Sequence, residues 1–119
     1  MSANLVTVTI AVSAAPNDTM PSEGNFVFSP NGILWPGTPG SLPVVPMIQQ
    51  GHLVNSTASV QLLASDNFSA GVLGWDIIIN IRGMPTINCP GVVINFATGP
   101  TQSVWDILNA FGYTFISQP

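Results

Sequence analysis

The residues that could carry out chemistry are few and dispersed in this chain. It has a single histidine, His52, which lies next to Gly51 and has no cysteine or acid as an evident partner. One histidine without a thiolate cluster predicts no metal site. The acids are scattered along the sequence, several of them in turns where Asp often caps local backbone groups: Asp18, Glu23, Asp66, Asp76 and Asp106. We therefore expect no enzyme activity, no metal and no cofactor.

The low charge content of the chain excludes some classes of binding partner. The 119 residues are 46% hydrophobic and only 5% charged, and Arg82 is the one basic residue, which gives a net charge of −4. Nucleic-acid binding and attachment to a membrane through basic clusters both need a basic surface, so neither is expected. Disorder is disfavoured by the high hydrophobicity. So uncharged a chain is typical of a protein that works while packed against other protein.

Cysteine usage and the N-terminal residues add further expectations. The single cysteine, Cys89, excludes an intrachain disulfide framework and predicts a small buried hydrophobic side chain. The first residues carry no basic region, so we expect no signal peptide, and no apolar run approaches the ~20 residues of a membrane-spanning helix. The sequons at Asn17, Asn55 and Asn67 are interpreted as chance occurrences in a chain rich in Asn, Ser and Thr.

Several short segments alternate apolar and polar residues with the period of a β-strand. We predict strands near residues 6–12, 25–30, 58–65, 74–82 and 91–97, with one or two short strands in 47–54 and a last one at 113–116. Pro30 and Asn31-Gly32 are expected to end the second strand. The predicted core residues are Val6, Val8, Ile10, Phe28, Val60, Leu62, Trp75, Ile77, Ile79, Ile94 and Phe96.

Two segments break the strand pattern. Residues 30–46 contain five prolines and three glycines, which predicts a long irregular loop. Residues 103–111 place apolar side chains at helical spacing, with Ser103 and Asp106 at capping-box spacing, and this predicts one short helix. We therefore predict a single domain over residues 1–119, an all-β antiparallel β-sandwich, immunoglobulin-like or related, with one short helix near the C-terminus.

Several short motifs along the chain carry a resemblance to a known family. They are the first strand at 4–10, Gly24-Asn25-Phe26-Val27-Phe28-Ser29-Pro30, the strand at 58–67, Gly74-Trp75-Asp76-Ile77, the reversing glycine Gly83, and the closing segment 91–107 followed by Leu108. Together they resemble small β-sandwich modules of actinobacteriophage virion proteins. The chain differs from these modules in its long loop at 30–46, in its reduced charge after the Trp strand, where only Arg82 remains, and in lacking an adsorption or coiled-coil region.

The resemblance implies a non-catalytic structural protein of the virion, assembled in the host cytoplasm. It would decorate or stabilise the particle exterior, with capsid decoration favoured slightly over a minor tail role, and its partners would be capsid or tail subunits and copies of itself. A receptor- or carbohydrate-binding module of a phage tail is the alternative, and a secreted adhesin-like domain is a third.

Attachment would have to rely on apolar burial, because so few residues are charged. Trp35 is expected to anchor the contact, since Trp often dominates interface energies. The residues expected at this interface are Ile33, Leu34, Trp35, Leu42, Val44, Val45, Phe115 and Ile116.

Overall fold

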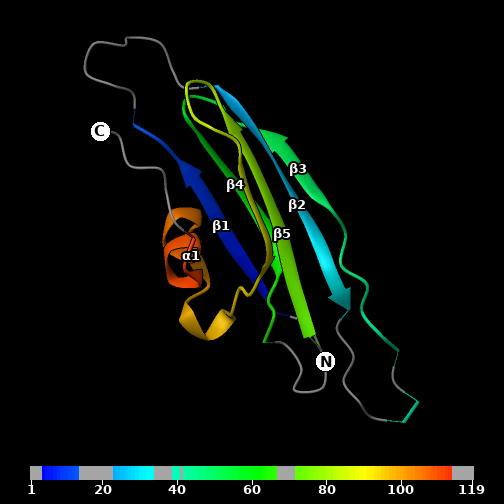
Figure 1. The fold of residues 1–119 in the computed structure, drawn as a ribbon. Coiled ribbons are helices and arrows are strands. Elements are labelled where there is room, and N and C mark those ends of the chain that lie inside the picture. The colour runs from blue at the N-terminus through cyan, green and yellow to red at the C-terminus, as the bar shows by residue number, and fades with distance from the viewer. Residues whose placement is uncertain (1–3, 14–22, 34–38, 41, 67–71, 114–119) are drawn as a thin grey trace.

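The chain folds into two β-sheets with one short helix at an edge (Figure 1). The structure, a computed structural model, describes residues 4–13, 23–33, 39–40, 42–66 and 72–113, without the side chains of Ile33 and Val72. In chain order the elements are β1 (Leu5–Ala11), β2 (Gly24–Ile33), β3 (Gln49–His52), β4 (Thr57–Leu63), β5 (Val72–Ile81), β6 (Ile87–Val92), the 3-10 helix η1 (Phe96–Thr98), β7 (Thr101–Ser103) and α1 (Val104–Phe111).

One sheet has the strand order β4-β1-β7 and the other β3-β2-β5-β6. β1 pairs with β4 in an antiparallel register that runs without interruption from Leu5–Leu63 to Ala11–Thr57. β7 pairs with β1 in parallel, with Thr7 opposite Thr101. The prediction of purely antiparallel sheets is therefore wrong at this pair. The chain crosses from β6 to the other sheet through η1, and it reaches β1 running in the same direction.

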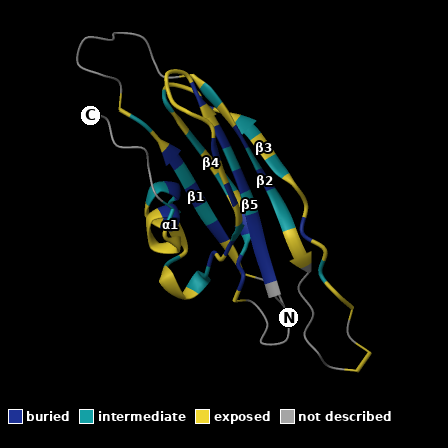
Figure 2. Cartoon of the chain, viewed as in Figure 1, coloured by how far each residue is buried: buried dark blue, intermediate teal, exposed yellow. Residues whose placement is uncertain are grey.

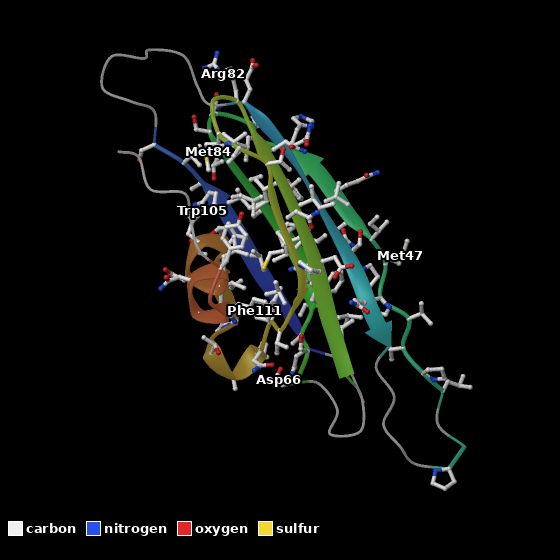
Figure 3. The ribbon with its side chains drawn as sticks, in the orientation of Figure 1. Met47, Asp66, Arg82, Met84, Trp105 and Phe111 are labelled. Carbon is white, nitrogen blue, oxygen red and sulfur yellow. The ribbon has the colours of Figure 1, made fainter. Side chains whose placement is uncertain are left out.

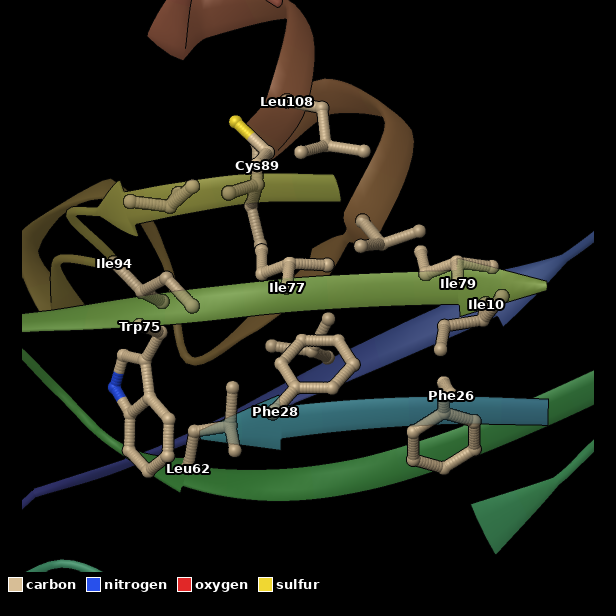
Figure 4. Close-up of a cluster of buried hydrophobic side chains, with 14 of the residues drawn as sticks. Ile10, Phe26, Phe28, Leu62, Trp75, Ile77, Ile79, Cys89, Ile94 and Leu108 are labelled. Carbon is tan, nitrogen blue, oxygen red and sulfur yellow. The ribbon is translucent and has the colours of Figure 1, made fainter. Parts of the chain in front are cut away.

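The core lies between the two sheets (Figures 2 and 4). Every predicted core residue is buried except Val60 and Phe96, which are half-buried and pack against the core. The Trp75 side chain is 1% exposed, and its Nε1 donates a hydrogen bond to the Leu63 carbonyl at 3.0 Å. Trp75 therefore ties β5 of one sheet to β4 of the other.

β2 is longer than the sequence predicts, because it continues through Pro30 and Asn31-Gly32 to Ile33. All ten of its residues have partners on β5, while β3 pairs only with Asn25 to Phe28. Pro30 therefore falls where β2 has no β3 partner, and a proline can occupy such an edge position because no ladder donor is needed there. The expected stop at this proline is wrong for that reason.

The strand predicted at 91–97 is displaced to 87–92, and η1 follows it. Ile94 is buried, but its backbone bonds to Ser65: the Ile94 N–H donates to Ser65 Oγ and its carbonyl accepts from the Ser65 N–H. The Asp66 carboxylate accepts from the N–H groups of Phe96 and Ala97, at 2.8 and 3.0 Å. The alternating burial here reflects anchoring to residues 65–66 rather than a sheet ladder.

The predicted helix is confirmed as α1, which packs on β1, β6 and β7. Its N-cap is Ser103, whose hydroxyl accepts from the Trp105 N–H, and it buries Val104, Ile107 and Leu108. Trp105 Nε1 donates to the Ala11 carbonyl at 2.7 Å, which fixes α1 against the end of β1. Tyr113 is described outside regular structure, while residues 114–116 of the predicted last strand lie outside the described residues.

Candidate protein–protein interface

The segment before β3 carries the three most exposed large apolar side chains of the described residues, Leu42, Met47 and Val45, followed in sequence by Ile48. Leu42 is 82% exposed, Met47 75%, Val45 69% and Ile48 51%. These four residues form what we call the apolar strip. Figure 3 shows Met47 pointing away from the sheets beside the strand edge. An exposed run of apolar residues on a folded domain is typical of a contact with another protein.

The local sequence explains why this segment presents its apolar side chains outward. Pro43 and Pro46 lack N–H donors, so the segment cannot form a continuous ladder, and β3 begins only at Gln49. Burial alternates along it: Val44 is half-buried and Pro46 buried, while Val45 and Met47 are exposed. In an extended chain alternate side chains point to opposite sides. Val44 and Pro46 therefore hold the middle of the segment to the domain and leave Val45 and Met47 facing solvent. Leu42 and Ile48 are exposed at the two ends of this alternating stretch, although alternation alone would place them on the side of Val44 and Pro46.

Three of the predicted interface residues can be placed fully in the structure. Leu42 and Val45 are exposed as the interface prediction requires, but Val44 packs against the core, so it is not an exposed contact residue. Ile33 has its backbone in β2, opposite Val72. The other predicted members lie outside the described residues: Leu34, Trp35, Phe115 and Ile116.

Sequence reasoning missed Met47 and Ile48, which were assigned to a possible strand. A signal for them was present, because residues 42–48 contain only apolar residues and prolines. In such a run every outward position is apolar, whichever way the extended chain is turned. The strip could therefore have been predicted from composition, before its exact pattern of exposure was known.

The strip lies in a part of the chain that carries no formal charge. From Gly24 to Ser65 there is no Asp, Glu, Lys or Arg, and His52 is the one titratable side chain of that stretch. A contact made by the strip cannot depend on ion pairs within it. Its free energy would come from apolar burial, which gives about 1.5–3 kcal/mol for each fully buried Leu, Val, Ile or Met side chain.

Among the residues that could do chemistry, Glu23, His52 and Arg82 line one open hollow of about 570 Å³, and the other acids of the described residues are not part of it. His52 is exposed on β3 opposite Asn25, whose Oδ1 accepts from Asn80 Nδ2 at 3.2 Å. Asp66 caps η1, and Asp76 accepts a hydrogen bond from the Gly91 N–H at 2.9 Å. No three His, Cys, Asp or Glu side chains among the described residues are grouped as metal ligands. These carboxylates have backbone partners that account for their positions.

Cys89 occupies the core beside α1 (Figure 4). Burial raises the pKa of its thiol, because the apolar surroundings disfavour the thiolate. A buried thiol of this kind is a poor nucleophile at neutral pH. Its expected role as a small hydrophobic core residue is confirmed by its burial.

Comparison of the chain with protein-family models, with curated proteins and with solved structures gives no match. The resemblance to phage virion modules therefore stands on the short motifs alone. Within the described residues no helix has both the length and the apolar character needed to cross a membrane.

Proposed function

We propose that this chain is a non-catalytic structural protein of a phage virion, which attaches to the exterior of the particle through the apolar strip. The exposed, uncharged strip is the observation that carries the proposal. The motif resemblance supplies the virion context, and capsid decoration remains favoured over a minor tail role. The finer assignment of the sandwich as immunoglobulin-like belongs to the same proposal.

The magnitude of apolar burial suggests how such a protein would attach. Four fully buried side chains of the strip would contribute roughly 6–12 kcal/mol. Association costs an estimated 4–15 kcal/mol in lost rigid-body and side-chain freedom. A single strip is therefore marginal by itself, and stable attachment would need neighbouring contacts or several linked copies. Repeated copies on a symmetric particle would meet this requirement.

The copy number of the chain in purified particles of the phage that encodes it tests the proposal. A decoration protein should be present in tens to hundreds of copies per particle, measured by quantitative mass spectrometry against the major capsid protein. Absence of the chain from purified particles would contradict the proposal. A copy number of only a few would favour a minor tail or receptor-binding role over capsid decoration.

A second candidate, a carbohydrate-binding module, is supported by a hollow of about 430 Å³ between η1, β7 and α1. Its lining includes Asn95, Thr98, Asp106 and Phe111, and Phe111 is 45% exposed. An exposed ring beside amide, hydroxyl and carboxylate groups is a set that can stack on a sugar and bond its hydroxyls. Binding on a glycan array that is lost in Phe111→Ala would favour this candidate, whereas no binding to any glycan would remove it.

A further inference from the structure

The outer edge of β4 lacks the features that normally protect an edge strand. β4 has seven residues, without Pro, charge or register shift in its pairing with β1. The other edge strands differ: β3 has four residues, β7 has three and leads into α1, and β6 contains Pro90 and a register shift against β5. Long, regular and uncharged edges are templates for pairing with another strand.

The hydrogen bonds at both ends of β4 show which of its backbone groups point outward. The Ser56 carbonyl accepts from the Val12 N–H, and the Ala64 N–H donates to the Asn4 carbonyl. Residues 56 and 64 therefore point toward β1. Because this direction alternates along an antiparallel pair, Thr57, Ser59, Gln61 and Leu63 direct their backbone N–H and C=O groups to the outer edge.

Both ends of this edge already hold hydrogen bonds. At the C-terminal end of β4, the Leu63 carbonyl accepts from Trp75 Nε1 at 3.0 Å. Val54 and Thr57 exchange two backbone hydrogen bonds, at 2.8 and 3.1 Å, across the turn that joins β3 to β4. The remaining stretch runs from Ser59 to Leu63, and its midpoint is Gln61. Beside it lies a groove of about 940 Å³ between β3 and β4, lined in part by Gln50, Ser59 and Gln61, so the described residues leave space next to this edge.

We propose that the edge of β4 pairs with β4 of a second copy of this chain, antiparallel and about a two-fold axis at Gln61. Gln61 of one copy then faces Gln61 of the other, and Ser59 faces Leu63 of the second copy. The two Gln61 residues can exchange two backbone hydrogen bonds, and the outward Leu63 N–H can donate to the Ser59 carbonyl of the second copy, whereas the Leu63 carbonyl already accepts from Trp75 Nε1. The two three-stranded sheets become one continuous sheet.

The side chains of the edge fit a second copy. On the core side, half-buried Val60 would lie opposite Leu62 of the second copy, an apolar pair that extends the core. On the outer side, Leu63 lies beside Leu5, which is 45% exposed. No formal charge occurs between Gly24 and Ser65, so two chains of net charge −4 can meet here without like charges at the contact. This self-complementarity in backbone and side chains identifies the occupant as a second copy.

The inference stands apart from the virion proposal, because it concerns only the purified chain. Pairing would also place two apolar strips on one unit, which would raise their combined affinity for a surface that engages both. The binding free energy of a single strip is marginal, and the dimer would provide the two linked strips needed for stable attachment. Failure of one proposal leaves the other open to its own test.

Sedimentation equilibrium of the purified chain, with charge substitutions at the axis, tests the dimer. The wild-type chain should dimerise. Gln61→Lys and Gln61→Glu should each raise the dimer dissociation constant on the order of fivefold, because like charges would face each other directly across the axis. An equal mixture of the two variants should restore dimerisation, since an ammonium group of one chain would then face a carboxylate of the other. Circular dichroism establishes that each variant is folded.

Asn88 provides the matched control, because it is exposed on β6, an edge of the other sheet. Asn88→Lys and Asn88→Glu should dimerise as the wild type does, alone or mixed. A wild-type chain that remains monomeric up to roughly 1 mM would overturn the proposal, since weaker association contributes little. So would equal effects at Gln61 and Asn88, or a mixture of the Gln61 variants that fails to restore the dimer.

Discussion

The two described tryptophans make the same kind of hydrogen bond in different surroundings. Trp75 Nε1 donates to the Leu63 carbonyl from a fully buried ring, whereas Trp105 is only half-buried when its Nε1 donates to the Ala11 carbonyl. Trp75→Phe removes a bond between the sheets and leaves a cavity, so it should lower the free energy of unfolding by about 2–4 kcal/mol. Trp105→Phe should cost about 1 kcal/mol, because it removes the hydrogen bond at a site that water can reach. Urea denaturation followed by circular dichroism measures both, and a larger loss at Trp105 would contradict this account.

Burial of the Cys89 thiol makes the stability of the folded chain depend on pH. Burial raises its pKa above the ordinary value of 9.0, so the folded state favours the neutral thiol more than the unfolded state does. This contribution to stability is fully present below pH 9 and is lost as the pH rises above it. The native chain at a pH of about 7 should therefore resist a thiol-specific reagent and react once unfolded in urea. Rapid reaction of the native chain would show that Cys89 is accessible.

At the scale of elements, the tight pairing of β2 with β5 depends on a glycine at the start of β2. A methyl group at Gly24 would overlap the backbone carbonyl of Asn80 on β5. Gly24→Ala should therefore lower the free energy of unfolding by about 2 kcal/mol or more, because the strands would have to move apart. Thermal unfolding measures the effect.

Gly83 is the control for this prediction. It has a φ of +87° in the turn after β5, and a methyl group there would meet nothing within 4 Å. Gly83→Ala should cost about 1–2 kcal/mol, from the left-handed backbone alone. Equal or smaller loss at Gly24 would show that β2 can shift away from β5 easily.

Much of the β-structure can be predicted from the alternation of apolar and polar residues along the sequence, because a strand with one face on the core directs every second side chain inward. This pattern correctly predicts the inward residues of β1, β4 and β5, and it indicates α1 by its change to helical spacing. It fails where alternation has another cause. Ile94 is buried because Ser65 binds its backbone, and Ser65 is 29 residues away in sequence.

Pairing partners and exposure are harder to predict from local pattern. Pro30 can continue β2 only because β3 stops opposite Phe28, a fact about another strand. The parallel placement of β7 beside β1 depends on where η1 directs the chain. At the candidate interface, the apolar run 42–48 indicates the strip, but the sequence does not show that Val44 and Pro46 turn toward the domain while Val45 and Met47 face solvent.

At the scale of the whole molecule, exposed and buried positions of the strip segment should respond differently to the same change. Val45→Ser should leave the free energy of unfolding within about 0.5 kcal/mol of wild type, because the side chain is 69% exposed. Val44→Ser should cost about 1–2 kcal/mol, because it places a hydroxyl against the core. Urea denaturation tests the pair, and a large loss at Val45 would mean that the strip is needed for folding rather than for contact.

The central claim is that the chain attaches to its particle by apolar burial through the strip. Its most direct test is the affinity of purified chain for particles that lack it, measured at low and high salt. The account predicts that raising the salt from about 0.05 to 0.5 M changes the dissociation constant by no more than about twofold, because screening acts on charged contacts. It also predicts that Val45→Asp weakens binding by roughly tenfold or more at either salt concentration. Strong weakening of wild-type binding by salt, or wild-type affinity in Val45→Asp, would contradict it.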